Sequence, residues 1–438
     1  MSNSIPARDD AIGVGLMGLG NVGAGVAQIL RERGQVFAQG VGRPLQVRRI
    51  LVRDPNKERD GRIDRSLLTT DPRQILDDEG IDIVIEMIGG EQPAYDYIKD
   101  ALSSGRHVVT ANKEVMAKHG PELLDIARQK GVDILYEASV GGGIPLIAPL
   151  KRDLLANELT SIAAIINGTT NYILTRMARE GIDYAEALAG AQALGYAEAD
   201  PRNDVGGIDA AYKLAILAAL AFRMDVNPDA VYREGITDLT ARDFRYAAEL
   251  GYAIKLLALG QRTDHAIQLR VHPALVPLDA PLAKVDGVFN AVQLEGDLTG
   301  QVLFQGRGAG SMPTTSAVVA DLLDVAHALA QDGVERSDWR QDRAVTIQPI
   351  DNLRTRYYLR LAVQDRAGVL ARITAVLGEA NNISIASIIQ KEVDESAGTA
   401  ELVIMTHEAV EAAMQQALVA IAAIDTVVEV GTFLRVMG

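Results

Sequence analysis

A lysine and an aspartate lie four residues apart in an otherwise apolar stretch. Asp209 and Lys213 are the only charged residues of segment 208–222. This segment reads as an apolar helix, on which a spacing of four places both side chains on one face. A lysine in such a helix must be paired or point into a cleft. Burial and nearby charges can tune its pKa, so it suits proton transfer to a reacting oxygen.

A glycine-rich loop near the start of the chain has the pattern of a dinucleotide site. It follows a strand-like run and opens a helical pattern, and its residues are Gly18, Gly20, Asn21, Val22 and Gly23. Glycines there permit the tight turn, let main chain approach a pyrophosphate and let helix and strand pack closely. The helix N-terminus adds free N–H groups. At the end of the second strand-like run, Arg53 suits the 2′-phosphate of NADP and Asp54 the ribose of NAD. We expect NADP, with NAD still open.

Other polar residues follow strand-like runs or adjoin the lysine–aspartate pair. Lys113 comes after 107–110, and the carboxyl ends of parallel strands face the ligand crevice. The glycine-rich segment 136–143 offers carbonyls and one carboxylate, the ligands of a hard cation. A hinge loop without metal is the alternative. Asp204 lies close to the lysine–aspartate pair in sequence and either joins a polar site or belongs to a plain polar turn.

Strand-like and helical patterns alternate in the first third of the chain. The strand-like runs are 12–16, 47–52, 81–85, 107–110 and 132–136, and the helical patterns are 21–33, 72–78, 94–103 and 121–130. This alternation predicts an α/β fold, a Rossmann-type doubly wound parallel sheet, over residues 1–150.

The middle of the chain is less regular. We expect an α+β domain over 151–335. Its predicted elements are helices over 208–222, 246–259 and 317–330 and a strand over 266–272 that Pro273 ends. A polar linker of mixed charge follows at 336–352.

The last part of the chain has a separate pattern. Strands are predicted over 357–363, 383–390, 399–406 and 427–436, with helices over 368–380 and 409–424. The order βαββαβ predicts a ferredoxin-like domain over 353–438.

Composition excludes several classes of protein. The formal charge of −15 argues against sequence-independent binding to the phosphate backbone of nucleic acids. The chain has no cysteine, which excludes disulfides and thiolate chemistry. No apolar run approaches the ~18 residues of a membrane span, and the first residues do not form a secretory signal. We expect a cytoplasmic protein with a small-molecule substrate and no nucleic-acid or membrane partner.

Eight ordered segments together resemble homoserine dehydrogenase in its longer form, with a C-terminal ACT domain. They lie at 18–23, 86–90, 109–113, 136–145, 166–171, 195–201, 204–214 and 308–314 and read GLGNVG, EMIGG, VTANK, YEASVGGGIP, INGTTN, GYAEADP, DVGGIDAAYKL and GAGSMPT. The resemblance covers nearly the whole chain. It implies that 151–335 is the catalytic and dimerisation domain, with a return segment near 305–330 that packs on the cofactor domain. It implies NAD(P)-dependent interconversion of L-aspartate 4-semialdehyde and L-homoserine, on the route to threonine, methionine and isoleucine.

The resemblance also implies roles for individual residues. Lys213 is the general acid/base, Lys113 lies near nicotinamide and substrate, and the division of proton transfer between them is open. Glu198 binds the substrate ammonium, with Asp204 and Asp209 completing the polar site. The implied cofactor contacts include Gly89, Gly90, Lys113 and Gly308, and the implied ligands of a monovalent, sodium-like cation are Glu137, Val140, Gly142 and Ile144.

The C-terminal module resembles an ACT regulatory domain. Its implied ligand residues are Asp365, Arg366, Ala367, Gly368, Asn382 and Ile383. We expect feedback inhibition by L-threonine, or else a module that only supports assembly into a homodimer or homotetramer. Two other functions stay open: another amino-acid-linked dehydrogenase on this scaffold, and a catalytically silent amino-acid sensor.

Overall fold

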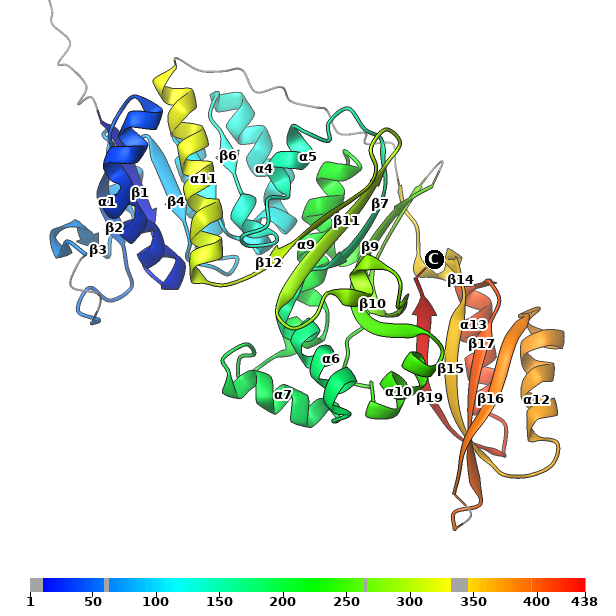
Figure 1. Ribbon diagram of the computed structural model, residues 1–438. Helices are drawn as coiled ribbons and strands as arrows, with labels where there is room; N and C mark the ends of the chain where they lie inside the picture. The colour runs from blue at the N-terminus through cyan, green and yellow to red at the C-terminus, as the bar shows by residue number, and fades with distance from the viewer. Residues whose placement is uncertain (1–10, 59–62, 264–265, 332–345, 395, 438) are drawn as a thin grey trace, which may run out of the picture. The chain divides into compact units, whose positions relative to one another are not determined.

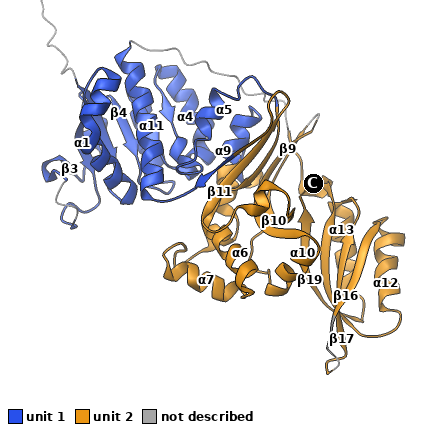
Figure 2. Ribbon diagram, viewed as in Figure 1, with its two compact units in different colours: residues 1–158, 215–228, 304–343 blue, residues 159–214, 229–303, 344–438 orange. Residues whose placement is uncertain are grey.

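The computed structural model describes residues 11–58, 63–263, 266–331, 346–394 and 396–437 (Figure 1). The chain forms two compact units (Figure 2). Unit 1 comprises residues 1–158, 215–228 and 304–343, and unit 2 comprises 159–214, 229–303 and 344–438. Of the predicted linker 336–352, the part up to 345 lies outside the described residues. None of the described helices is long and apolar enough to span a membrane.

Unit 1 contains a parallel sheet, as the alternating pattern predicts. Its described strands are β1 (Ile12–Met17), β2 (Leu45–Leu51), β3 (Leu68–Thr69), β4 (Ile83–Glu86), β5 (His107–Thr110) and β6 (Ile134–Leu135). They lie in the order β3-β2-β1-β4-β5-β6, and each neighbouring pair is parallel. The order reverses between β1 and β4, which is where a doubly wound sheet binds its ligand. The Rossmann-type fold class is confirmed.

Helices flank this sheet. They are α1 (Asn21–Val41), α2 (Arg73–Leu76), α3 (Ala94–Ser103), α4 (Lys113–Lys130), α5 (Ile147–Lys151) and α11 (Ser311–Ala330). Helix α11 comes late in the chain and packs against α1 in the apolar core of this unit (Figure 1). The approach is close, since a Cβ on Gly25 would lie 2.4 Å from the Thr315 hydroxyl.

Three predicted helix boundaries in unit 1 are wrong. Helix α1 continues to Val41 instead of ending at 33, and α11 begins at Ser311 instead of 317. The pattern starts a helix at Pro121, but α4 begins at Lys113 and continues through this proline. Asn112 caps the helix, its side-chain oxygen accepting a hydrogen bond from the Val115 N–H at 3.1 Å. A proline inside a helix removes a hydrogen bond, and the cap with the buried face of α4 outweighs that loss here.

Unit 2 is built on a large mixed sheet. Its first elements are β7 (Leu159–Ile165), α6 (Gly168–Glu180), α7 (Tyr184–Ala193), α8 (Arg202–Val205), β8 (Tyr232–Arg233), α10 (Ala241–Glu249), β9 (Tyr252–Arg262), β10 (Ala266–Pro277) and β11 (Phe289–Gly296). The boundary between the two units falls within α9 (Ile208–Ala221) and β12 (Gly300–Arg307). Single 3-10 turns occur at Arg65–Leu67, Glu137–Ser139, Pro228–Ala230, Pro281–Lys284 and Ile350–Asn352.

Two predictions for unit 2 are wrong. The predicted helix 246–259 is split: α10 ends at Glu249, and Tyr252–Arg262 is strand β9. Most of this strand is buried, so its apolar run lacks the alternation that distinguishes strands from helices. Strand β10 also continues through Pro273. This proline lies between the stretch of β10 that pairs with β8 and the stretch that pairs with β19 (Val427–Val436), where a missing N–H is tolerated.

The C-terminal part has the predicted ferredoxin-like order. Its elements are β13 (Thr346–Ile347), β14 (Arg354–Thr355), β15 (Tyr357–Gln364), α12 (Val369–Ala375) with a π-helical turn at Val376–Ala380, β16 (Ile385–Asp394), β17 (Thr399–Thr406), β18 (Ala409–Val410), α13 (Glu411–Ala422) and β19. Strands β19, β15, β17 and β16 are neighbours in that order, and all three pairs are antiparallel. This ferredoxin-like fold is confirmed.

The C-terminal module continues the sheet of the middle domain. Strand β19 pairs in parallel with β10 through Arg435 and Val436, so the described strands form one sheet from β12 to β16. The pattern of the sequence did not predict this continuity, because these strands lie far apart along the chain.

Charged side chains also cross the seam between β10, α10 and the C-terminal module. Arg435 is 1% exposed and donates to Glu234 and Glu411 at 2.5 to 3.0 Å. Arg360 donates to Asp243 at 2.8 Å, and the Tyr246 hydroxyl donates to Glu401 at 2.6 Å. Breaking such buried pairs costs several kcal/mol, roughly 3–5. The module is therefore an integral part of unit 2.

Candidate functional site

The loop between β1 and α1 is shaped by its glycines. Gly18 has φ +104°, and a Cβ there would lie 2.9 Å from the Met87 carbonyl oxygen. A Cβ on Gly23 would lie 2.3 Å from the Gly18 oxygen, whereas one on Gly20 would meet nothing within 4 Å. Two glycines thus allow close packing, and the third leaves open space. Helix α1 has no acidic residue in its first turn and no side-chain cap, so its N-terminus suits an anion.

The loops after β4 and β5 are joined by a buried carboxylate. Glu86 accepts hydrogen bonds from the Ile88 N–H and the Thr110 hydroxyl, both at 2.6 Å. Thr110 Oγ1 in turn accepts the Asn112 N–H at 3.0 Å, and Asn112 Nδ2 donates to the Gly90 carbonyl at 2.7 Å. Burial raises the pKa of Glu86.

This hydrogen-bond network adjoins three of the predicted cofactor residues. Gly89 and Gly90, both with positive φ, belong to the loop after β4. Lys113 is half-buried and is the first residue of α4, directly after the Asn112 cap. Sequence reasoning gave Glu86 no role. The signal that could have identified Glu86 is a carboxylate at the end of the apolar strand β4, within the EMIGG segment.

Arg53 and Asp54 lie just after β2. Both side chains are exposed. Asp54 Oδ1 accepts the Asn56 N–H at 2.8 Å and so helps to form a local turn.

The loop from Glu137 to Ile144 is buried except at Gly143. Both carboxylate oxygens of Glu137 accept N–H groups at the start of α5, from Leu146, Ile147 and Ala148, at 2.6 to 2.9 Å. The Glu137 N–H donates to Asp321 on α11 at 2.8 Å. Burial raises the pKa of Asp321 to about 7.

The glycines of this loop explain how it meets the return segment. A Cβ on Gly142 would lie 2.6 Å from the carbonyl oxygen of Gly308, so the two predicted residues touch through main chain. Val140, Gly142 and Ile144 are all buried.

The lysine–aspartate pair exists in unit 2. Lys213 Nζ donates to Asp209 Oδ2 at 2.7 Å and to the Ile166 carbonyl at 2.8 Å. The lysine is 9% exposed and the aspartate 3%. Both lie on α9 one turn apart, as their spacing predicts.

An asparagine links this pair to Asp204. Asn167 Nδ2 donates to Asp204 Oδ1 at 2.7 Å and to Asp209 Oδ2 at 2.8 Å. Sequence reasoning quoted its motif but gave Asn167 no role. Three of the predicted residues, Asp204, Asp209 and Lys213, are thus brought together. Glu198 is exposed, and its carbonyl accepts a hydrogen bond from Gln192 at 3.1 Å.

The predicted regulatory residues lie in two segments of the C-terminal module. Residues 365–368 form an exposed turn between β15 and α12, in which Gly368 has φ +89°. Asn382 is exposed with φ +53°, and Ile383 is 1% exposed in the module's apolar core. Arg366 Nη1 donates to the Gln364 side chain at 3.2 Å.

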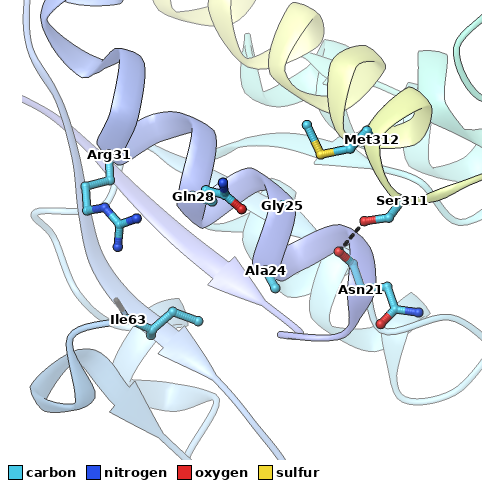
Figure 3. A pocket seen from close by; sticks show the side chains of 8 residues that line it. All are labelled: Asn21, Ala24, Gly25, Gln28, Arg31, Ile63, Ser311 and Met312. Carbon is cyan, nitrogen blue, oxygen red and sulfur yellow. Dashed lines mark hydrogen bonds between the residues drawn. The ribbon is translucent and has the colours of Figure 1, made fainter. Parts of the chain in front are cut away.

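A cavity of about 270 Å³ lies beside α1 (Figure 3). It is lined by Asn21, Ala24, Gly25, Gln28, Arg31, Ile63, Ser311 and Met312. The Ser311 hydroxyl donates to the Asn21 carbonyl at 2.7 Å, which ties the start of α11 to the first turn of α1.

Three family models match the chain. They are "Homoserine dehydrogenase, NAD binding domain" over 18–137, "Homoserine dehydrogenase" over 145–323 and "ACT domain" over 357–423. The homoserine dehydrogenase of Neisseria gonorrhoeae is 42% identical over 430 residues, which cover 97% of this chain and 98% of that protein.

Solved structures agree. A homoserine dehydrogenase from Thiobacillus denitrificans matches with a TM-score of 0.90 and 43% identity over 98% of each chain. A hyperthermophilic archaeal homoserine dehydrogenase in complex with NADPH matches with a TM-score of 0.61 and 26% identity, over 72% of this chain and 97% of that one. The Rossmann-type sheet and the buried lysine–aspartate pair agree with these full-length relatives. The chain therefore belongs to the homoserine dehydrogenase family of oxidoreductases, in the form that carries an ACT domain.

Proposed function

We propose that this protein reduces L-aspartate 4-semialdehyde to L-homoserine, reversibly, with NADPH as the preferred hydride donor. The observation that carries the proposal is the buried Lys213–Asp209 pair, within the segment that matches the family. When bound, the nicotinamide supplies a hydride to the aldehyde carbon. Negative charge then develops on the aldehyde oxygen, and an ammonium in a dry site stabilises it and supplies the proton.

The residues of this chain fit those tasks. Asp209 holds Lys213 as an ammonium and fixes its direction. Glu198, Asp204 and Asp209 supply the negative charge that a substrate ammonium needs. We assign Lys113 to the substrate and the nicotinamide, with a share in proton transfer.

The cofactor assignment rests on the glycine loop and on Arg53. Open space at Gly20 and the uncapped start of α1 fit a pyrophosphate, and Asn21, Val22, Gly89, Gly90 and Gly308 complete the proposed contacts. Exposed Arg53 can pair with a 2′-phosphate, while Asp54 is engaged in a turn. The archaeal relative described with NADPH supports the same choice. Replacing Arg53 with alanine should raise the KM for NADPH and leave the KM for NADH unchanged.

We also propose a monovalent cation, such as Na⁺, in the loop from Glu137 to Ile144. The Glu137 carboxylate already accepts three N–H groups, so the donors that fit are carbonyl oxygens of Glu137, Val140, Gly142 and Ile144. A set of neutral carbonyls suits a single positive charge better than Ca²⁺, which usually takes carboxylates. The cation would stiffen the loop against Gly308. Titrating NaCl against choline chloride at constant ionic strength should raise activity and the melting temperature.

For the ACT module we propose feedback inhibition by L-threonine through residues 365–368, Asn382 and Ile383. Deleting the module would be a poor test, because it would expose Asp243, which is fully buried. Asp365→Ala and Asn382→Ala alter exposed positions instead. Both should weaken threonine inhibition while leaving uninhibited turnover intact. Unchanged inhibition in both variants would contradict the role.

The first assay is absorbance-monitored NADPH oxidation with L-aspartate 4-semialdehyde, run in parallel with NADH and with L-threonine. Oxidation that depends on the semialdehyde supports the dehydrogenase. NADPH binding without oxidation would favour the silent sensor or another dehydrogenase.

We further propose that the protein is cytoplasmic and forms a homodimer or homotetramer. Light scattering on the purified protein tests the number of subunits.

A further inference from the structure

Asn167 occupies a junction between a helix start and two carboxylates. It follows β7 and caps α6, its Oδ1 accepting the Thr170 N–H at 2.8 Å and the Thr170 hydroxyl at 3.1 Å. Its Nδ2 donates to Asp204 and Asp209, and the residue is 5% exposed. The side-chain oxygen therefore faces the start of α6, and the side-chain nitrogen faces the two aspartates.

The type of residue matters here. An amide offers one acceptor oxygen and two N–H donors. The Thr170 N–H can only donate, which fixes the oxygen of Asn167 toward the helix and the NH₂ group toward the carboxylates. Aspartate or serine would cap the helix equally well. Aspartate would place a third carboxylate in the cluster, and serine would lose both donors.

Two consecutive residues, Ile166 and Asn167, bind the two members of the Lys213–Asp209 ion pair. Ile166 accepts from Lys213 through its carbonyl, and Asn167 donates to the oxygen of Asp209 that Lys213 also contacts. Two neighbouring carboxylates raise each other's pKa unless donors stabilise their charge. Asp204 from α8 and Asp209 and Lys213 from α9 belong to this hydrogen-bonded cluster, and Asn167 supplies neutral donors between the two acids.

We propose that Asn167 is a positioning residue that keeps Asp204 and Asp209 ionised together and thereby holds Lys213 as an oriented ammonium. This inference rests on the proposed role of Lys213 as proton donor. It assigns Asn167 no contact with substrate. The asparagine acts on the reaction through the charge state of the acids and the direction of the lysine.

Two substitutions test this, and a second helix cap serves as the matched control. Asn167→Ser keeps a capping hydroxyl and removes the donors, and Asn167→Asp keeps the cap and adds a charge. Asn112→Ser makes the first change at the cap of α4, where the lost donor served the Gly90 carbonyl. Rates are normalised to NADPH-binding sites, so that partial misfolding does not mimic a catalytic defect.

We expect Asn167→Ser to lower kcat/KM for the semialdehyde about 10- to 100-fold, with NADPH affinity unchanged. In Asn167→Asp the acidic limb of the kcat/KM–pH profile should move to higher pH, because one carboxylate keeps its proton longer. Part of the lost activity should then return as pH rises. Asn112→Ser should raise the KM for NADPH and leave the acidic limb in place.

Near-wild-type kcat/KM in Asn167→Ser would overturn the proposal. So would equal losses at every pH in both variants together with a lower melting temperature, since that pattern describes a cap alone. If Lys213→Ala itself retains wild-type turnover, the proposed function of the lysine fails instead, and the two failures are distinguishable.

Discussion

The cofactor loop of unit 1 and the ion cluster of unit 2 are built in opposite ways. Between β1 and α1 the shape comes from missing side chains: Gly18 and Gly23 are in contact through main chain, and Gly20 leaves a space. Around Lys213 the shape comes from side chains that hydrogen-bond one another. A site made of main chain should fail when atoms are added, and a site made of side chains should fail when atoms are removed.

The largest effect should come from removing the amine in unit 2. In Lys213→Ala, kcat should fall about 10²- to 10⁴-fold, the usual contribution of a positioned acid or base. Steady-state kinetics with the semialdehyde measures this, and fluorescence titration should show unchanged NADPH affinity. Lys99→Ala, which removes a half-buried lysine paired with Glu122, is the control and should retain activity.

Two glycine-to-alanine substitutions in unit 1 distinguish a glycine needed for packing from one that leaves room for the cofactor. Gly20→Ala adds a methyl group where nothing lies within 4 Å, so the melting temperature should hold while the KM for NADPH rises at least about tenfold. Gly23→Ala places a Cβ 2.3 Å from an oxygen and should cost about 1–3 kcal/mol of stability. Equal behaviour of the two variants in calorimetry and kinetics would contradict the distinction.

An effect of similar size should come from the Glu137 carboxylate, which binds main chain in unit 1. Glu137→Gln replaces one acceptor oxygen with an NH₂ group that faces N–H donors of residues 146–148. We expect a loss of about 1–3 kcal/mol in the free energy of unfolding. Urea titration measures it, with Glu122→Gln at an exposed position as control. If Glu137→Gln lowers the free energy of unfolding no more than the control does, the bonds from Glu137 to the main chain contribute little.

A further effect in unit 1 should appear only as a change of stability with pH. The folded pKa of Asp321, about 7, lies above its ordinary value of 3.8. The folded state therefore resists ionisation there, and the stability present below about pH 4 is lost as pH rises toward 7. Asp321→Asn should gain melting temperature relative to wild type over this range.

Local patterns in the sequence predicted what is local in the structure. The glycine loop follows from six consecutive residues, and the Lys213–Asp209 pair follows from a spacing of four. Asn167 was missed because its partners lie 37 and 42 residues further along the chain. Strand β9 was misread because burial hides the alternation of a strand. The pairing of β19 with β10 joins residues more than a hundred positions apart, which no short pattern encodes.

The position of α11 in unit 1 sets an order for folding. Val318, Leu322 and Val325 complete an apolar core that also holds Val26 and Ile29 of α1. The Asn21–Ser311 hydrogen bond spans 290 residues. At a synthesis rate of roughly 5–20 residues per second, α1 waits about 15 to 60 s on the ribosome for its partner helix. During that time its apolar face is open to chaperones, and a fragment limited to the first 150 residues would leave it open permanently.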